Sequence, residues 1–320
     1  MPCEEGIMKH NHCGGSGIGI LASLCLAMVV LMTAASAAAQ DVPMHGKTVL
    51  ITGSTDGMGR ELALRLGAMG ADVIVHGRNL ERGNAVVEQI RSDGGRAWFY
   101  PADLASLDAV RSLADRVLTG HDALHLLINN AGIGSGVSSG GERPLSEDGH
   151  ELIFQVNYLS HFLLTELLLP RMLESAPARI INVASAGQRP INFSDVMMSE
   201  HYNPGSAYTQ SKLAQILHAF ELAKRLENTG VNVYALHPAT FMDTTLVREA
   251  GATPRSTVDE GADAVMNLAV SEEFAQHSGI YLNRKREARA NAQAYDHEAR
   301  RKLDRLSREL TGLDASAATE

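Results

Sequence analysis

The chain has 320 residues, of which 45% are hydrophobic and 20% are charged, and it carries a formal net charge of −9. This length is sufficient for a full hydrophobic core, and the composition is ordinary for a globular protein. The negative charge argues against a nucleic-acid-binding protein, because no surplus of basic residues offsets the repulsion of phosphates.

The cysteines are confined to the N-terminal segment: Cys3, Cys13 and Cys25. The rest of the chain therefore has neither a disulfide nor a thiolate nucleophile. His10, His12 and Cys13 lie close together, but the stretch around them is rich in glycine and has no fourth ligand. We expect no metal site there or elsewhere.

Residues 1–43 resemble a targeting segment. No Asp, Glu, Lys or Arg occurs between Lys9 and Asp41, and residues 18–32 are a nearly unbroken apolar run. Small residues follow, including the triplet Ala37-Ala38-Ala39, which is a layout typical of a secretory signal peptide.

Two other interpretations of this segment stay open. Residues 18–39 hold no charge and are long enough for an uncleaved membrane anchor, which predicts membrane association. Translation from Met32 or Met44 would instead leave a cytosolic enzyme. In each case we expect the folded domain to occupy residues 44–320.

A strand, a glycine turn and a helix are predicted at the start of that domain. The short apolar run from Lys47 to Thr52 is followed at once by Gly53-Ser-Thr-Asp-Gly57-Met-Gly59, and then by apolar residues at helical spacing. Glycines permit a tight turn and let backbone amides approach a pyrophosphate at the helix N-terminus. A turn without a ligand is the alternative.

The second predicted strand, residues 72–76, bears on the choice of cofactor. NAD sites usually present a carboxylate after this strand for the ribose 2′-hydroxyl, whereas an arginine suits the 2′-phosphate of NADP. Here Gly77-Arg78-Asn79 follows the strand, and no acid occurs between Asp72 and Glu81. The pattern favours NADP(H), with NAD(H) as the alternative.

Strands and helices alternate up to about residue 130. The third strand leads to Asp103, whose carboxylate could bind an adenine amino group or cap the next helix. The fourth leads to Asn129-Asn130-Ala131-Gly132, where small residues would let a flat ring lie against the strand end. The alternation predicts an α/β fold: a Rossmann-like, doubly wound parallel sheet in three layers and one domain, with its ligand at the strand C-termini.

Tyr208 and Lys212 lie four residues apart in a predicted helix, so their side chains share one face. A nearby cation favours the phenolate and would bring the pKa of the tyrosine toward neutrality, as an acid/base catalyst requires. Taken alone, the pair could equally be a packed tyrosine and a solvated lysine.

The C-terminal part is basic: residues 284–310 hold nine Lys/Arg against five Asp/Glu. Leucines at 303, 306, 310 and 313 follow helical spacing, and Gly312 is a plausible stop. This pattern predicts a solvated amphipathic helix that packs on the domain.

In combination, these motifs resemble those of the short-chain dehydrogenase/reductase family. They are the glycine turn 52–59, the segment 129–132, Ser185 after "RIINVA", and Tyr208-Thr-Gln-Ser-Lys212. The resemblance covers about residues 44–313. The stretches "AYTQSKLAQILHAFELAKRL" and "ALHPAT" are most similar to the retinol-dehydrogenase-like branch, which typically uses NADP(H).

The resemblance implies roles for individual residues. Tyr208 matches the proton donor and acceptor, and Lys212 matches the residue that lowers the phenol pKa and binds the nicotinamide ribose. Ser185 matches the hydroxyl that orients the substrate carbonyl, and Asn157 matches the asparagine that holds a water in a proton relay. The implied cofactor contacts are Gly53, Ser54, Thr55, Gly57, Met58, Gly59, Arg78, Asp103, Leu104, Asn130, Ala131, Gly132, Tyr208, Lys212 and Pro238.

Two features depart from the family pattern. The usual Pro-Gly is Pro238-Ala239 here, and the threonine that should follow is shifted, which leaves the candidates Thr240, Thr244 and Thr245. In addition, Ser185 and Tyr208 are separated by a long segment, which we expect to form part of the substrate wall.

The expected activity is reversible hydride transfer between NADP(H) and an alcohol/carbonyl pair. Residues 241–256 with Phe193, Met197 and Met198 suggest a partly apolar pocket for a lipophilic substrate. A catalytically silent NADP-binding sensor is the alternative. Because the reduced cofactor pool is intracellular, we expect the catalytic domain to face the cytosol, and the family's habits suggest a homo-oligomer.

Overall fold

One eight-stranded sheet organises the chain. The computed structural model describes residues 44–138 and 142–313; the predicted targeting segment 1–43 lies outside these ranges. The sheet has the order β3-β2-β1-β4-β5-β6-β7-β8 and is parallel except for β8, which pairs antiparallel with β7. Its strands are β1 (Thr48–Ile51), β2 (Asp72–Gly77), β3 (Arg96–Pro101), β4 (Leu126–Asn129), β5 (Ala178–Val183), β6 (Val231–His237), β7 (Ile280–Asn283) and β8 (Arg286–Glu287).

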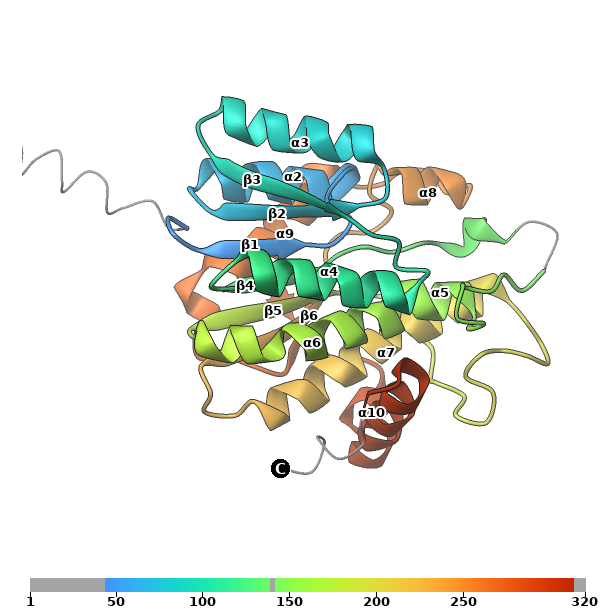
Figure 1. Ribbon diagram of the computed structural model, residues 1–320. Helices are drawn as coiled ribbons and strands as arrows, with labels where there is room; N and C mark the ends of the chain where they lie inside the picture. The colour runs from blue at the N-terminus through green and yellow to red at the C-terminus, as the bar shows by residue number, and fades with distance from the viewer. Residues whose placement is uncertain (1–43, 139–141, 314–320) are drawn as a thin grey trace, which may run out of the picture. The chain divides into compact units, whose positions relative to one another are not determined.

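Helices cover both faces of the sheet (Figure 1). On one face lie α2 (Gly57–Ala68), α3 (Leu80–Ser92) and α9 (Val258–Val270), and on the other lie α4 (Leu107–Gly120), α6 (Ser160–Glu174) and α7 (Pro204–Arg225). The shorter α5 (Leu152–Phe154) and α8 (Thr245–Glu249) lie in the connections, and α10 (His297–Thr311) follows the sheet. The predicted three-layered, doubly wound α/β fold is confirmed.

The alternation of side chains along each strand produces two hydrophobic cores. Leu50 of β1 belongs to the core beneath α4, α6 and α7, whereas its neighbours Val49 and Ile51 belong to the core beneath α2, α3 and α9. All three are fully buried. Near-continuous apolar runs such as 48–51 are therefore the pattern that a two-sided parallel sheet requires.

The strand order reverses at β1, which lies between β2 and β4. The chain runs outward through β2 and β3 and then returns to the other side of β1 to form β4. At such a reversal the loops after neighbouring strands part and leave a crevice at the C-terminal edge of the sheet. This topology places the glycine turn after β1 and the segment after β4 side by side at that edge.

An apolar helical run, Leu152–Glu174, is long enough to cross a membrane, and it is the one such run in ranges 44–138 and 142–313. It comprises α5, a π-helical turn and α6. However, 83% of its apolar window is buried inside the protein. Its hydrophobicity is thus explained by packing between the sheet and the neighbouring helices.

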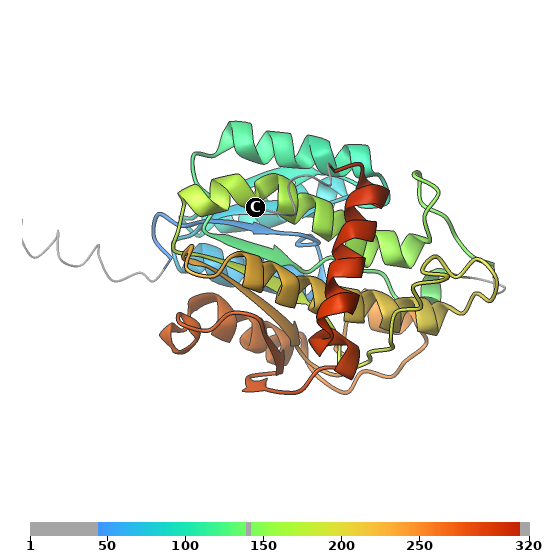
Figure 2. The same cartoon turned by 90° about the horizontal axis from the view of Figure 1, so that it is seen from below.

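The predicted C-terminal helix is α10, which crosses α7 (Figure 2). Gly312 ends it in the left-handed conformation with φ of 62°, as the sequence indicated. Leu303 is buried and Leu306, Leu310 and Leu313 pack against the core. The expectation of solvated basic residues is only partly correct, because Arg308 is buried among helices.

Candidate active site

The glycine turn lies between β1 and α2, and its geometry depends on glycine. Gly53 and Gly57 have positive φ values of 64° and 51°. A Cβ on Gly59 would lie 2.2 Å from the carbonyl oxygen of Gly53, so a larger residue cannot fit there. Helix α2 begins at Gly57, and its first intrahelical donor is the amide of Arg60. The amide of Gly57 donates to the Asp56 carboxylate at 2.7 Å, so the amides of Met58 and Gly59 are the ones placed to receive the phosphates of a dinucleotide.

The side chains of Ser54 and Met58 in this turn are buried, whereas that of Asp56 is exposed. The Ser54 hydroxyl donates to the carbonyl of Ile51 at 2.7 Å, and Met58 is buried in the core beneath α2. The methyl of Thr55 packs closely over Gly77, at the end of β2. A cofactor contact at Met58 would be made by its backbone, whereas the Ser54 amide already donates to the carbonyl of His76 at 2.8 Å.

Arg78 and Asp103, both predicted cofactor residues, are paired with each other. Their side chains lie 3.3 Å apart, and Arg78 is 68% exposed. The other carboxylate oxygen of Asp103 accepts from the amide of Ala105 at 3.0 Å. Leu104 has its side chain in the core, and its carbonyl accepts from Ser160 at 2.6 Å. Arg78 therefore remains accessible to a ligand.

The segment after β4 is held against the glycine turn. The side-chain amide of Asn130 donates to the carbonyls of Thr52 at 2.8 Å and Gly53 at 3.2 Å. A Cβ on Gly132 would lie 3.2 Å from Asn157 Oδ1 and 3.6 Å from Lys212 Nζ. The structure thus brings predicted cofactor and catalytic residues together, and Gly132 lets them approach.

Asn157 lies in a π-helical turn, Gln155–Leu159, immediately before α6. Its side chain is fully buried. It accepts from the amide of Ile133 at 2.8 Å and donates to the carbonyl of the same residue at 3.1 Å. It also donates to the hydroxyl of Ser211 on α7 at 3.0 Å. These contacts differ from those of a helix-interior asparagine that bonds the backbone of its own helix.

Ser185, Tyr208 and Lys212 come from two elements. Ser185 follows β5, and its hydroxyl accepts from the amide of Gly187 at 3.1 Å. Tyr208 and Lys212 lie on one face of α7, with the lysine nitrogen 5.7 Å from the centre of the tyrosine ring. This nitrogen donates to the carbonyl of Val183 at 2.9 Å and to Gln215 Oε1 at 3.0 Å.

Burial is the main cause of the pKa shifts of both Tyr208 and Lys212. It raises the pKa of Tyr208, although a hydrogen bond with Ser185 acts in the opposite direction. Burial also lowers the pKa of Lys212, to about 7. In the protein alone the pKa of Tyr208 is therefore raised, and not lowered as sequence reasoning expected, because burial outweighs the hydrogen bond with Ser185.

The loop after β6 spreads the candidate threonines apart. Pro238 is buried. The hydroxyl of Thr240 lies 3.1 Å from Nε2 of His237, at the strand end. Thr245, in contrast, donates to the carboxylate of Asp56 at 2.9 Å, and Thr244 packs on Gly57. Two of the three threonines therefore contact the glycine turn.

The residues proposed for the substrate wall have different surroundings. Phe193 and Met197 pack against the core, and the Lys302 ammonium of α10 lies 5.0 Å from the Phe193 ring centre. Met198 has a positive φ of 49°. Phe241 is 44% exposed, and the guanidinium of Arg255 lies 5.4 Å from its ring centre. Of these four side chains, Phe241 presents the most open apolar surface.

Sequence reasoning missed three polar residues that support the site: Thr52, His161 and Gln215. Each is at most 1% exposed. His161 is one helical turn after Asn157 and Gln215 is nearly one turn after Lys212, so helical spacing from a predicted catalytic residue was the available signal.

The chain matches the family model described as short chain dehydrogenase over residues 47–255. It is 36% identical to retinol dehydrogenase 12 of Bos taurus over 288 residues, covering 85% of this chain and 89% of the relative. An uncharacterised protein of Mycobacterium paratuberculosis has a similar structure, with a TM-score of 0.69 and 30% identity over 85% of this chain and 96% of that one. The NADP complex of RhlG from Pseudomonas aeruginosa has a TM-score of 0.62 and 28% identity over 75% and 94% of the two chains.

The chain belongs to the short-chain dehydrogenase/reductase family. Its similarity to retinol dehydrogenases places it in the branch that the sequence motifs indicated, and it is an alcohol/carbonyl oxidoreductase that depends on a nicotinamide dinucleotide.

Proposed function

We propose that this protein interconverts a lipophilic alcohol and its aldehyde or ketone, with NADP(H) as cofactor and Tyr208 as acid and base. The observation that carries this proposal is the meeting of Tyr208 with Ser185 on one side and Lys212 on the other. All three lie at the C-terminal edge of the sheet, where the reversal of strand order leaves a crevice.

The glycine turn and the segment 130–132 fit a dinucleotide, because a Cβ at Gly59 or Gly53 would collide with neighbouring backbone. When bound, NADP(H) supplies or accepts the hydride, and its oxidised ring carries a positive charge. The amides at the start of α2 would hold its phosphates, and Arg78 would bind the 2′-phosphate. The NADP found with RhlG, a relative in fold and sequence, supports this preference.

The side chains divide the remaining work. In the oxidative direction Tyr208 removes the hydroxyl proton of the substrate, and Ser185 donates a hydrogen bond to the same oxygen and stabilises its developing charge. Lys212 in its charged form favours the phenolate, and we propose that it exchanges its contacts with Val183 and Gln215 for the ribose and the tyrosine. Asn157 would hold the water of the proton relay.

The lipophilic substrate rests on two points. One relative is a retinol dehydrogenase by name, and retinol is an apolar alcohol. The open ring of Phe241, in the connection between β6 and α9, offers apolar surface near the crevice. We infer that this connection selects for apolar substrates and that the catalytic residues do not discriminate between short and long substrates.

We further propose that residues 44–320 form the catalytic unit, preceded by a targeting or anchoring segment, and that this unit faces the cytosol, where NADPH is available. A homo-oligomer stays a prediction. The outer face of α7 is partly covered by α10, which limits that helix as an interface.

The proposal is tested by NADPH consumption against a panel of aldehydes and ketones that ranges from short polar to long apolar compounds. We expect turnover with NADPH that rises with substrate hydrophobicity, and slower turnover with NADH. Binding of NADPH without turnover of any carbonyl in the panel would support the silent sensor instead.

A further inference from the structure

His161 is a buried polar residue in α6 that the mechanism above does not use. It is 1% exposed. Its Nδ1 lies 2.9 Å from the carbonyl oxygen of Asn157, and its Nε2 lies 2.9 Å from the hydroxyl oxygen of Thr52. The imidazole therefore links the π-helical turn to the end of β1, two segments that are distant in sequence.

The partners determine which ring nitrogen carries the proton. A carbonyl oxygen only accepts hydrogen bonds, so Nδ1 of His161 must donate to Asn157. The oxygen of Thr52 already accepts from the backbone amides of Asn130 at 2.9 Å and Ala131 at 3.0 Å, which uses both of its lone pairs. Nε2 must then accept from the threonine hydroxyl, and the imidazole is neutral.

Burial supports this assignment. It lowers the pKa of His161 to about 3, and the nearby Lys212, His76 and His218 act in the same direction. A second acceptor for the threonine hydroxyl, the carbonyl of Ile128, is farther away at 3.3 Å. The shorter contact with His161 is thus the one that orients the hydroxyl.

Thr52 and Asn157 hold the two ends of one short segment. Thr52 binds the amides of Asn130 and Ala131, and Asn157 binds both backbone groups of Ile133. Gly132 lies between them, close enough to Lys212 that an added Cβ would be 3.6 Å from its nitrogen. Any shift of this segment would therefore be felt at the catalytic lysine.

We propose that His161 is a positioning residue that fixes the direction of the Thr52 hydroxyl and, by also binding the carbonyl of Asn157, holds the segment 130–133 in place. This segment forms the wall beside Lys212 against which the cofactor ring would lie. The inference rests on the proposed function for its consequence in catalysis, but the hydrogen-bond chain itself is independent of it.

The test replaces His161 by phenylalanine, which keeps a ring of similar size and removes both hydrogen bonds. Amide hydrogen exchange at single-residue resolution is the first readout. The Ala131 amide is the best reporter, since its hydrogen bond goes to Thr52, whereas the Asn130 amide also bonds Ile128. We expect exchange at Ala131 to be about tenfold faster relative to the core strands, because a freely rotating hydroxyl is a poorer acceptor.

Catalysis is the second readout. We expect kcat with NADPH to fall by about tenfold to a hundredfold in His161→Phe, equivalent to about 1.4–2.8 kcal/mol, with little change in KM for the carbonyl. The matched control is His218→Phe, another buried histidine, whose Nε2 has no hydrogen-bond partner in the described structure. This control should lie within about twofold of the wild type in both readouts.

The Thr52→Val substitution completes a double-mutant cycle with His161→Phe. In the Thr52→Val protein, His161→Phe should lower kcat little further, since the hydroxyl that His161 orients is already absent. Full additivity of the two substitutions, or an Ala131 amide that exchanges as slowly in His161→Phe as in the wild type, would overturn the proposal. If His161→Phe does not fold, His161→Asn replaces it, because the shorter amide can still bind Asn157 without reaching Thr52.

The proposed function and the role of His161 are tested separately. A wild-type protein that turns over no carbonyl would contradict the proposed function, yet the exchange rate at Ala131 would still decide whether His161 orients Thr52. Faster exchange spread evenly over all strands would show a general loss of stability and would also count against the proposal.

Discussion

Lys212 places an amine in the interior of the protein, where its charged form is unfavourable. The side chain is 4% exposed, and its pKa is lowered to about 7 by burial. Since an exposed lysine has a pKa near 10.5, the unfolded chain binds more protons than the folded chain between pH 7 and about 10. Stability should therefore rise with pH over this range as far as this residue is concerned.

Replacement of Lys212 by methionine should make the protein more stable and inactive. We expect the free energy of unfolding at pH 7 to increase by about 1–3 kcal/mol, because the buried amine is removed. The difference from the wild type should shrink as the pH approaches 10. Urea denaturation at pH 7 and pH 9.5 measures both, and a variant less stable than the wild type at pH 7 would show that the lysine's hydrogen bonds outweigh its burial.

Arg78 tests the cofactor preference. Its replacement by leucine should raise KM for NADPH by about tenfold to a hundredfold, the value of one charge-assisted hydrogen bond, and leave KM for NADH nearly unchanged. Arg96→Leu is the matched control, because this arginine is equally exposed but lies at the opposite, N-terminal end of the strands. Equal effects of Arg78→Leu on both cofactors would contradict a role in binding the 2′-phosphate.

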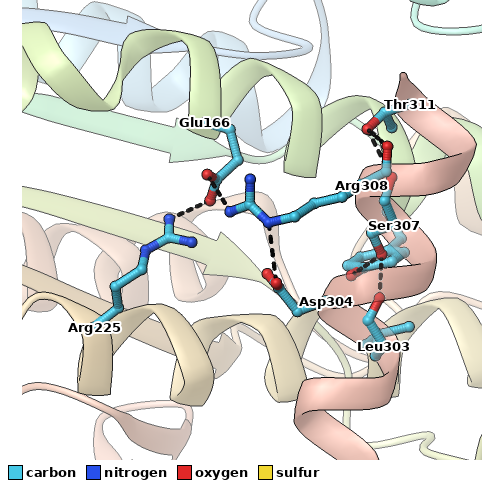
Figure 3. A network of polar contacts seen from close by, with 8 residues as sticks. Glu166, Arg225, Leu303, Asp304, Ser307, Arg308 and Thr311 are labelled. Carbon is cyan, nitrogen blue, oxygen red and sulfur yellow. Dashed lines mark hydrogen bonds and ion pairs between the residues drawn. The ribbon is translucent and has the colours of Figure 1, made fainter. Parts of the chain in front are cut away.

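At the scale of elements, a buried ionic network fastens α10 to the domain (Figure 3). Glu166 of α6 is paired with Arg225 of α7 and, at 2.8 Å, with Arg308 of α10. Arg308 is also paired with Asp304 at 3.1 Å and is 3% exposed. Burial alone would raise the pKa of Glu166, but the two arginines lower it. Three helices thus depend on one carboxylate.

Glu166→Gln should destabilise the protein by about 3 kcal/mol at pH 7, because it removes the buried carboxylate charge that Arg225 and Arg308 share. The pKa of Glu166 is lower in the folded protein than in the unfolded chain. Its contribution to the free energy of unfolding is therefore complete above the unfolded-state pKa and is lost as the pH falls through the folded-state pKa. The gap to the wild type should therefore close in acid. Thermal unfolding at pH 7 and pH 3.5 checks both statements.

The control for this network is Arg301→Gln, an exposed residue of the same helix. It should change stability by less than about 0.5 kcal/mol. A loss of stability in Arg301→Gln equal to that in Glu166→Gln would mean that the overall charge of α10, and not the buried network, determines its docking.

At the scale of the whole molecule, the sequence predicted what local patterns encode. The β1–turn–α2 unit follows from an apolar run, glycines at 53, 57 and 59, and helical spacing, all within about twenty residues. The end of α10 at Gly312 was likewise predicted from a local pattern. The alternation of strands and helices then implied the sheet, because parallel strands need crossover helices.

Features that depend on distant contacts were not predicted. The π-helical turn at Asn157 has no local signal, and its amide is directed to Ile133 by tertiary packing. The inward direction of Ser54 and the raised pKa of Tyr208 likewise follow from burial. Helical spacing placed Lys212 beside Tyr208 and Gln215 beside Lys212, but it did not show that the lysine nitrogen donates to Gln215 Oε1.

The proposed domain boundary makes a prediction for the whole chain. A protein that starts at Met44, whose side chain is buried and whose amide donates to Met69 at 3.2 Å, should fold and bind NADPH within about threefold of the full-length affinity. Fluorescence titration with NADPH measures this affinity. A truncated protein that fails to fold would show that residues before 44 belong to the catalytic unit.

The central claim is that Tyr208 transfers the proton in a site that binds NADP(H) without its help, so the most direct measurement compares Tyr208→Phe with the wild type in both turnover and cofactor binding. We expect kcat to fall by at least about a thousandfold while the dissociation constant for NADPH changes by less than about threefold. A phenylalanine variant that retains substantial carbonyl reduction would contradict the account.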